Sequence, residues 1–129
     1  MENGSNPSRF IPTIKLEHAD SRGEIYSIEL PDGQELMLLH SKAGSLRGGH
    51  SHSCDEVVVL LSGLMRYHKR GDDTVIMHGG ETSYNPADEV HMGEFLENSW
   101  VVEYKLGTHK GDWTQEDYEP YRAKVRASA

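Results

Sequence analysis

The distribution of apolar and polar residues along the chain predicts short β-strands rather than helices. From Ile14 onward, apolar or alternating stretches recur, and turn sequences such as Pro31-Asp32-Gly33 and Gly79-Gly80 separate them. The predicted strands cover residues 14–17, 24–30, 34–41, 57–61, 64–69, 74–78, 81–85 and 100–105. Since no long amphipathic helical pattern interrupts this series, we expect an all-β domain, built as an antiparallel sandwich or barrel.

The two ends of the chain have a different pattern. Residues 1–12 are polar and contain glycine and proline, which predicts a flexible arm or an edge strand exchanged with a partner. Residues 112–127 are predicted to be helical, with Thr114 as N-cap, although Pro120 argues against a single straight helix. The expected organisation is therefore an arm (1–12), one barrel (13–111) and a helical tail packed on the barrel (112–129).

Composition and charge narrow the classes of function. The 129 residues suit one domain, and the longest apolar run, residues 57–61, is far too short to cross a bilayer. The formal net charge of −8 disfavours nucleic acid as a partner, because an acidic surface repels phosphate backbones. No charged and then apolar signal segment opens the chain, so we expect a cytoplasmic protein with no membrane partner.

Cysteine and histidine usage bears on metal chemistry. Cys54 is the only cysteine, which excludes an internal disulfide and a thiolate metal cluster. The chain has eight histidines, a high number for its length, and this surplus points to metal or proton chemistry.

The sequence His50-Ser51-His52, followed by Glu56, is the segment with the most evident chemistry. Side chains alternate between the two faces of a strand, so residues separated by an even number share a face. If one unbroken strand runs through this segment, two imidazoles and a carboxylate point the same way and suit a divalent transition metal. Residues 57–61 are apolar at both odd and even positions, so both faces of this strand are predicted to be covered. A second sheet or a partner subunit would cover the outer face.

These residues also carry a resemblance to a known superfamily. The segment Gly44-x5-His50-x-His52-x3-Glu56-x6-Gly63 resembles the first cupin motif, and Gly80-x5-Pro86-x4-His91 resembles the second. Asp88 stands where the second motif usually has glycine, and Phe95 where asparagine is common. The resemblance implies a single jelly-roll barrel, frequent homodimers, and one divalent metal ion held by His50, His52, Glu56 and His91, with coordination positions left open for a ligand.

A narrower resemblance covers residues 20–122. Asp20-Ser21-Arg22-Gly23, Arg47-Gly48-Gly49-His50-Ser51-His52 and Asp117-Tyr118-x2-Tyr121 are similar to segments of RmlC-like sugar-nucleotide epimerases and 3,4-ketoisomerases. In the ketoisomerases the two histidines handle protons rather than a metal ion. That family commonly lacks the full set of metal ligands, whereas this chain carries it, so we prefer the metal-dependent interpretation.

Three classes of function remain open. The first is a metal-dependent isomerase, lyase or dioxygenase that acts on a small polar or anionic molecule, and iron, manganese, nickel, cobalt or zinc would fit its site. The second is a metal-independent sugar-nucleotide isomerase with His50 or His52 as the base. The third is a cupin that binds a small ligand without catalysis.

Three residues outside the metal set are candidates for catalysis. Tyr67 and Tyr84 are candidate proton donors, and Arg47 is a candidate partner for a carboxylate or phosphate. Arg22 is a candidate for the same binding role but not for catalysis. The alternative roles are ordinary: tyrosines in strands are usually packed, and we expect both arginines at surface or turn positions.

Overall fold

The computed structural model describes residues 9–69, 74–106 and 114–129. Most of the predicted N-terminal arm, and the first two residues of the predicted tail, lie outside these ranges. The described residues form eleven strands and one helix: β1 (Thr13–Asp20), β2 (Gly23–Glu29), β3 (Glu35–Ser41), β4 (Leu46–His52), β5 (Glu56–Ser62), β6 (Leu64–Lys69), β7 (Val75–His78), β8 (Thr82–Asn85), β9 (His91–Phe95), β10 (Ser99–Lys105), β11 (Thr114–Asp117) and α1 (Glu119–Ser128).

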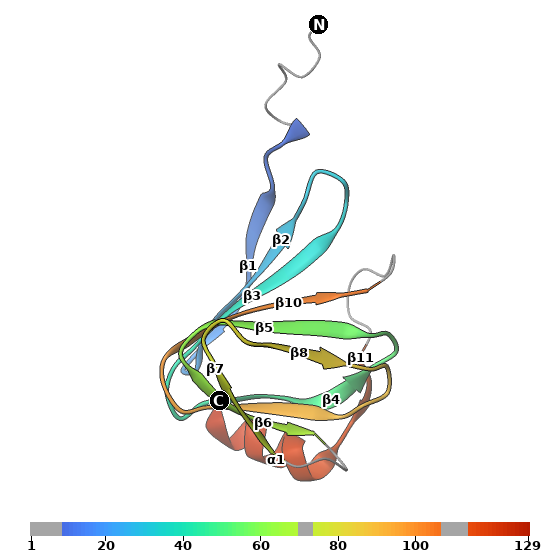
Figure 1. The fold of residues 1–129 in the computed structure, drawn as a ribbon. Coiled ribbons are helices and arrows are strands. Elements are labelled where there is room, and N and C mark those ends of the chain that lie inside the picture. Colours follow the sequence, from blue (N-terminus) through green and yellow to red (C-terminus); the bar gives the residue numbers. More distant parts are fainter. Residues whose placement is uncertain (1–8, 70–73, 107–113) are drawn as a thin grey trace, which may run out of the picture.

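The strands form two antiparallel sheets that enclose a common interior (Figure 1). The six-stranded sheet has the order β1-β2-β3-β10-β5-β8, and the five-stranded sheet has the order β11-β4-β9-β6-β7. Helix α1 packs on β4 and buries Val125. The prediction of an all-β fold with a short C-terminal helix is confirmed. None of the helical structure in the described ranges is long and apolar enough to span a bilayer.

Three strands were not predicted, and one of them corrects the expected helical tail. β4 carries arginine, glycine and histidine, and β9 carries histidine, glycine and glutamate, at positions where a strand pattern needs apolar residues. Residues 114–117 were expected to be helical, but they form β11, which pairs with β4. The helix begins only at Glu119, with Pro120 in its first turn, where the missing proline N–H breaks no helical hydrogen bond.

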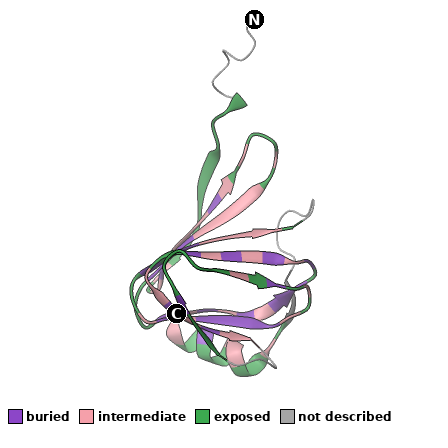
Figure 2. Ribbon diagram, in the orientation of Figure 1, coloured by how far each residue is buried: buried purple, intermediate pink, exposed green. Residues whose placement is uncertain are grey.

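The buried residues lie mainly between the sheets (Figure 2). Several large apolar residues are exposed on the outside. The buried cluster consists of Leu39, Val58, Leu60, Met65, Tyr67, Met77, Phe95 and Val101. β1 is exposed along almost its whole length. On β5, Val57 and Val59 are only half-buried and Leu61 is 51% exposed, so the described part of this chain provides no second sheet over that face. Of the two covers that the sequence predicted, the second sheet is therefore absent from the described residues, and a partner subunit stays a prediction.

Candidate metal centre and ligand cavity

Three histidines meet on two adjacent strands of the five-stranded sheet. His50 and His52 lie on β4, and His91 opens β9, where it is the register partner of His50. One ring nitrogen of each histidine lies within 4.8 Å of those of the other two. His52 and His91 are buried, and His50 is half-buried. The imidazoles are close enough to share one metal ion.

Glu56 reaches the histidines from the opposite sheet. β4 ends at His52 and β5 begins at Glu56, with residues 53–55 between them, so the expectation of one unbroken strand is wrong. The carboxylate nevertheless lies near both buried imidazoles: Oε2 is 3.5 Å from Nε2 of His52, and Oε1 is 3.5 Å from Nε2 of His91. A tight turn, rather than strand parity, brings Glu56 to this position.

The turn is held by β8 and by the loop that joins β8 to β9. The Asp55 carboxylate accepts hydrogen bonds from the backbone N–H of Ala87 at 2.9 Å and from the Tyr84 hydroxyl. The backbone N–H of Asp88 donates to the carbonyl of His52 at 2.8 Å. Asp88 has a φ of 71°, in the left-handed region that favours glycine, which accounts for the usual glycine at this position of the motif.

Burial governs the ionisation of these groups. It raises the pKa of the Glu56 carboxyl to about 8 and lowers the pKa of the His91 imidazole to about 4. Among the described residues, Oε2 of Glu56 is buried without a hydrogen-bond partner. An ionised carboxylate in this position needs a compensating positive charge. A divalent cation beside neutral imidazoles supplies that charge, so the donor set fits a metal ion.

Neighbouring groups orient these donors. Nδ1 of His91 lies 3.2 Å from the carbonyl of Glu89, and the tautomer that donates there leaves the Nε2 lone pair facing Glu56. Asn85 donates from Nδ2 to Oε1 of Glu56 at 3.3 Å and to the Tyr67 hydroxyl oxygen at 2.6 Å. Because burial raises the pKa of Tyr67, the phenol keeps its own proton, and that proton can be donated elsewhere.

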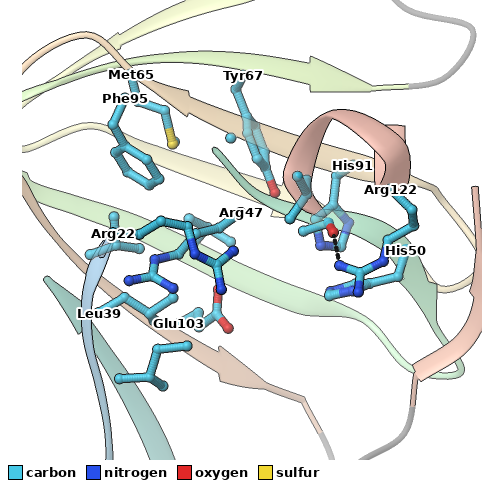
Figure 3. A pocket seen from close by; sticks show the side chains of 16 residues that line it. Arg22, Leu39, Arg47, His50, Met65, Tyr67, His91, Phe95, Glu103 and Arg122 are labelled. Carbon is cyan, nitrogen blue, oxygen red and sulfur yellow. Dashed lines mark hydrogen bonds between the residues drawn. The ribbon is translucent and has the colours of Figure 1, made fainter. Parts of the chain in front are cut away.

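A cavity of about 220 Å³ extends from the histidines into the barrel (Figure 3). His50, His91 and Tyr67 lie on one side of it, and the guanidinium groups of Arg22 and Arg47 on another. Its apolar wall consists of Ile25, Leu39, Val58, Met65, Phe95, Val101 and Val125. A second cavity of about 380 Å³ shares Ile25, Leu39, His50 and Glu103 with the first and also contacts His52.

The candidate catalytic residues have different surroundings. Tyr67 and Arg47 both line the cavity, and Arg47 is only 7% exposed, so the expected surface or turn position of Arg47 is wrong. Arg22 is also largely buried and lines the same cavity. Tyr84 is 50% exposed, is bonded to Asp55, and does not line the cavity. Tyr67 and Arg47 are thus placed to contact a ligand, whereas Tyr84 supports the turn before Glu56.

Sequence reasoning missed Glu103, Asn85 and Arg122. Glu103 faces the cavity from β10, and burial raises its pKa. A signal was available here, because Glu103 shares strand parity with the inward-facing Val101. Arg122 of α1 donates from Nη1 to the carbonyl of Gly48 at 2.8 Å. No local pattern predicts this contact, since it depends on where the helix packs.

Comparisons with known proteins bear on the fold. No protein-family model and no curated protein sequence matches the chain. KdgF from Halomonas sp. aligns with a TM-score of 0.62 and 14% identity over 70% of this chain and 84% of that one. A chain from the structures of the DMSP lyases RdDddP and RnDddQII aligns with a TM-score of 0.66 and 18% identity, over 81% of this chain and 62% of that one. An RmlC-like cupin from Shewanella frigidimarina aligns with a TM-score of 0.59 and 11% identity, over 74% of this chain and 86% of that one. At these identities the likeness is one of fold.

Proposed function

We propose that this chain, which has the cupin fold, binds one divalent transition metal ion through His50, His52, Glu56 and His91. The observation that carries the proposal is the buried Glu56 carboxylate, 3.5 Å from the Nε2 atoms of two imidazoles on the other sheet. Iron, manganese, nickel, cobalt and zinc all suit such a donor set. Four protein donors leave coordination positions for a ligand.

We further propose that the site acts on a small polar or anionic molecule, as an isomerase, lyase or dioxygenase. The bound ion would supply Lewis-acid polarisation of a carbonyl or carboxylate or, as iron, a position for dioxygen. Asn85 fixes the Glu56 carboxylate, and Tyr67 holds a phenolic proton with its ring centroid 6.0 Å from that of His91. One similar structure belongs to the DMSP lyases, which agrees with lyase chemistry as one of these classes.

A metal-independent sugar-nucleotide isomerase is the second candidate, and the position of His50 favours it. His50 lines both cavities, whereas His52 lines only the larger one, so either cavity offers a ligand His50 as a candidate base. This candidate leaves the buried Glu56 carboxyl without a chemical role. A cupin that binds a ligand without turnover is the third candidate, and a lack of activity toward every ligand that binds would favour it.

We also propose a homodimer that covers the outer face of the six-stranded sheet. Strand parity and register place apolar side chains side by side on this face: Tyr26, Ile28, Leu36, Leu38, Val57, Val59, Val102 and Tyr104. Leu61 and Trp100 extend the face and are 51% and 38% exposed. An apolar surface of this extent is typical of an interface, and a second copy covers it most simply through twofold symmetry.

Elemental analysis of untagged protein tests the metal site. We expect about one transition-metal ion per wild-type chain and a loss of most of that metal in His52→Ala and His91→Ala. His78→Ala is the matched control, because His78 is 67% exposed on β7 and lies outside the cluster. Wild-type metal content in both cluster variants would rule out the assignment.

A further inference from the structure

The Arg47 side chain is buried inside the barrel because of a β-bulge. Arg47 precedes His50 by three residues, an odd separation that would place the two on opposite faces of a regular strand. The register between β4 and β9 shifts between Gly48 and His50, so one extra residue is inserted on β4. Gly48 and Gly49 adopt φ values of 97° and 84° there. Arg47 and His50 therefore line the same cavity.

The Arg47 guanidinium is held in place by neutral hydrogen-bond partners. Its Nε donates to Oγ of Ser41 at 2.7 Å, and its Nη2 donates to the carbonyl of His40 at 3.1 Å. Both partners are uncharged, and a guanidinium has five N–H donors, so donors remain for a further acceptor. No carboxylate of the described residues forms an ion pair with Arg47, although Glu103 lines the same cavity.

Arg22, the other arginine on this side of the cavity, shows the contrast. Its Nε and Nη2 donate to the Asp20 carboxylate at distances of 2.6 to 3.1 Å, and its Nη1 donates to the carbonyl of Leu46. The charge of Arg22 is thus compensated within the chain. A buried cation is costly unless an anion accompanies it. Burial, and then the charge of Arg22, lower the pKa of Arg47, and the carboxyl groups of Asp20, Glu103 and Glu24 offset this only in part. None of the three forms an ion pair with Arg47 among the described residues.

We infer that Arg47 binds a carboxylate of the ligand, and that the ligand is a small dicarboxylate, or an oxo- or hydroxycarboxylate, whose second oxygen group meets the histidines. This inference rests on the proposed metal site for that second contact. A guanidinium fork matches a carboxylate through two parallel hydrogen bonds. The cavity of about 220 Å³ is at or below the low end of ligand pockets, roughly 300–1,000 Å³, which favours a small molecule over a nucleotide.

Calorimetric titration of manganese-loaded, untagged protein tests the inference. The probes are malonate, succinate and glutarate, each compared with its neutral diamide, and inorganic phosphate. We expect at least one dicarboxylate to bind about tenfold or more tightly than its diamide. Arg47→Gln should weaken that binding about tenfold or more, while the manganese content stays unchanged. Arg66→Gln is the matched control, because Arg66 is 40% exposed and pairs with Glu94 on the surface.

Each outcome supports or overturns the inference. Equal affinity of wild type and Arg47→Gln for the best dicarboxylate, or no preference for any diacid over its diamide, overturns it. If phosphate binds more tightly than every diacid, and Arg47→Gln weakens that binding, then Arg47 binds a phosphate group and the carboxylate assignment is overturned. If Arg47→Gln fails to fold, Arg47→Lys keeps the charge but loses the fork, and it should weaken binding by a similar factor.

The same titrations separate this inference from the proposed metal site. If wild type binds no manganese, the proposed metal site fails, and the Arg47 contact is then judged from metal-free protein by the preference for each diacid over its diamide. If manganese binds normally but Arg47→Gln leaves diacid affinity unchanged, the inference alone fails.

Discussion

The two sheets contribute opposite chemistry to the cavity. The five-stranded sheet supplies nitrogen bases and a cation, namely His50, His52, His91 and Arg47. The six-stranded sheet supplies the buried carboxyl group of Glu56 and the half-buried one of Glu103, set in an apolar wall. Neither sheet holds a complete donor set, so the proposed metal site exists only when the two sheets are packed together. Metal binding and folding should therefore be coupled.

The substitution Glu56→Gln removes the one carboxylate donor that the six-stranded sheet contributes, so its effect should be the largest. On the metal proposal, loss of an anionic donor should lower metal affinity by about 100-fold or more, that is about 2.7 kcal/mol. Without metal, Glu56→Gln should be more stable than wild type at neutral pH, because the buried wild-type carboxyl keeps a proton that the unfolded state releases. Competition with a chelator measures the affinity, and urea unfolding measures the stability.

The opposite result has a clear meaning. If the stability of wild type does not respond to a chelator, and Glu56→Gln behaves like wild type, then Glu56 does not serve a metal ion. The histidines would then be better interpreted as proton-transfer residues of the metal-independent candidate.

The glycines at the β4 bulge provide the second test, directed at the five-stranded sheet. At Gly48, with a φ of 97°, an added Cβ would lie 2.9 Å from the carbonyl oxygen of His91. We expect Gly48→Ala to lower the free energy of unfolding by about 2–3 kcal/mol, through backbone strain and displacement of β9. Gly44→Ala is the matched control, since Gly44 has a φ of 89° and no atom within 4 Å of the added Cβ.

The control should lose only about 1 kcal/mol, the cost of the strained backbone alone. Urea unfolding of the three proteins in the presence of a chelator measures the difference. Equal losses in the two variants would mean that the close approach of β4 to β9 at Gly48 contributes nothing to stability.

How much could be predicted from the sequence differs between the two sheets for a physical reason. β5 was predicted within one residue at each end, because its apolar run is a strong strand signal. β4 was not, because its inward-facing side chains are arginine and histidine, and two glycines form its bulge. The candidate site residues could be found from their spacing. Their convergence could not, because it depends on the turn at residues 53–55 and on sheet packing.

The outer face of the six-stranded sheet provides the third test. If a second copy covers it, sedimentation equilibrium at micromolar concentration should report about twice the monomer mass of 14.5 kDa. Leu38→Glu places a charge in the middle of this face and should weaken the dimer by about tenfold or more. Lys15→Glu on the exposed edge strand β1 is a control that should leave the mass unchanged. A wild-type monomer would contradict the proposal.

The smallest effect expected is a pH dependence in which the two sheets act in opposite directions. In metal-free protein the pKa of Glu56 is raised to about 8 from 4.5, so the folded state keeps a proton that the unfolded state releases. Glu56 therefore lowers stability as pH rises from 4.5 to 8. The pKa of His91 is lowered to about 4 from 6.5, so His91 lowers stability as pH falls from 6.5 to 4.

Between pH 6.5 and 8 His91 no longer opposes the Glu56 effect, and chelator-treated wild type should lose stability with rising pH. The slope should be on the order of 1 kcal/mol per pH unit, below the limit of about 1.4 for one proton. Glu56→Gln should flatten the profile in this window. Saturating metal should abolish the loss, because Glu56 is then ionised in both states. Parallel profiles of wild type and Glu56→Gln would show that the Glu56 carboxyl binds protons equally in the folded and unfolded states, and that its burial does not raise its pKa.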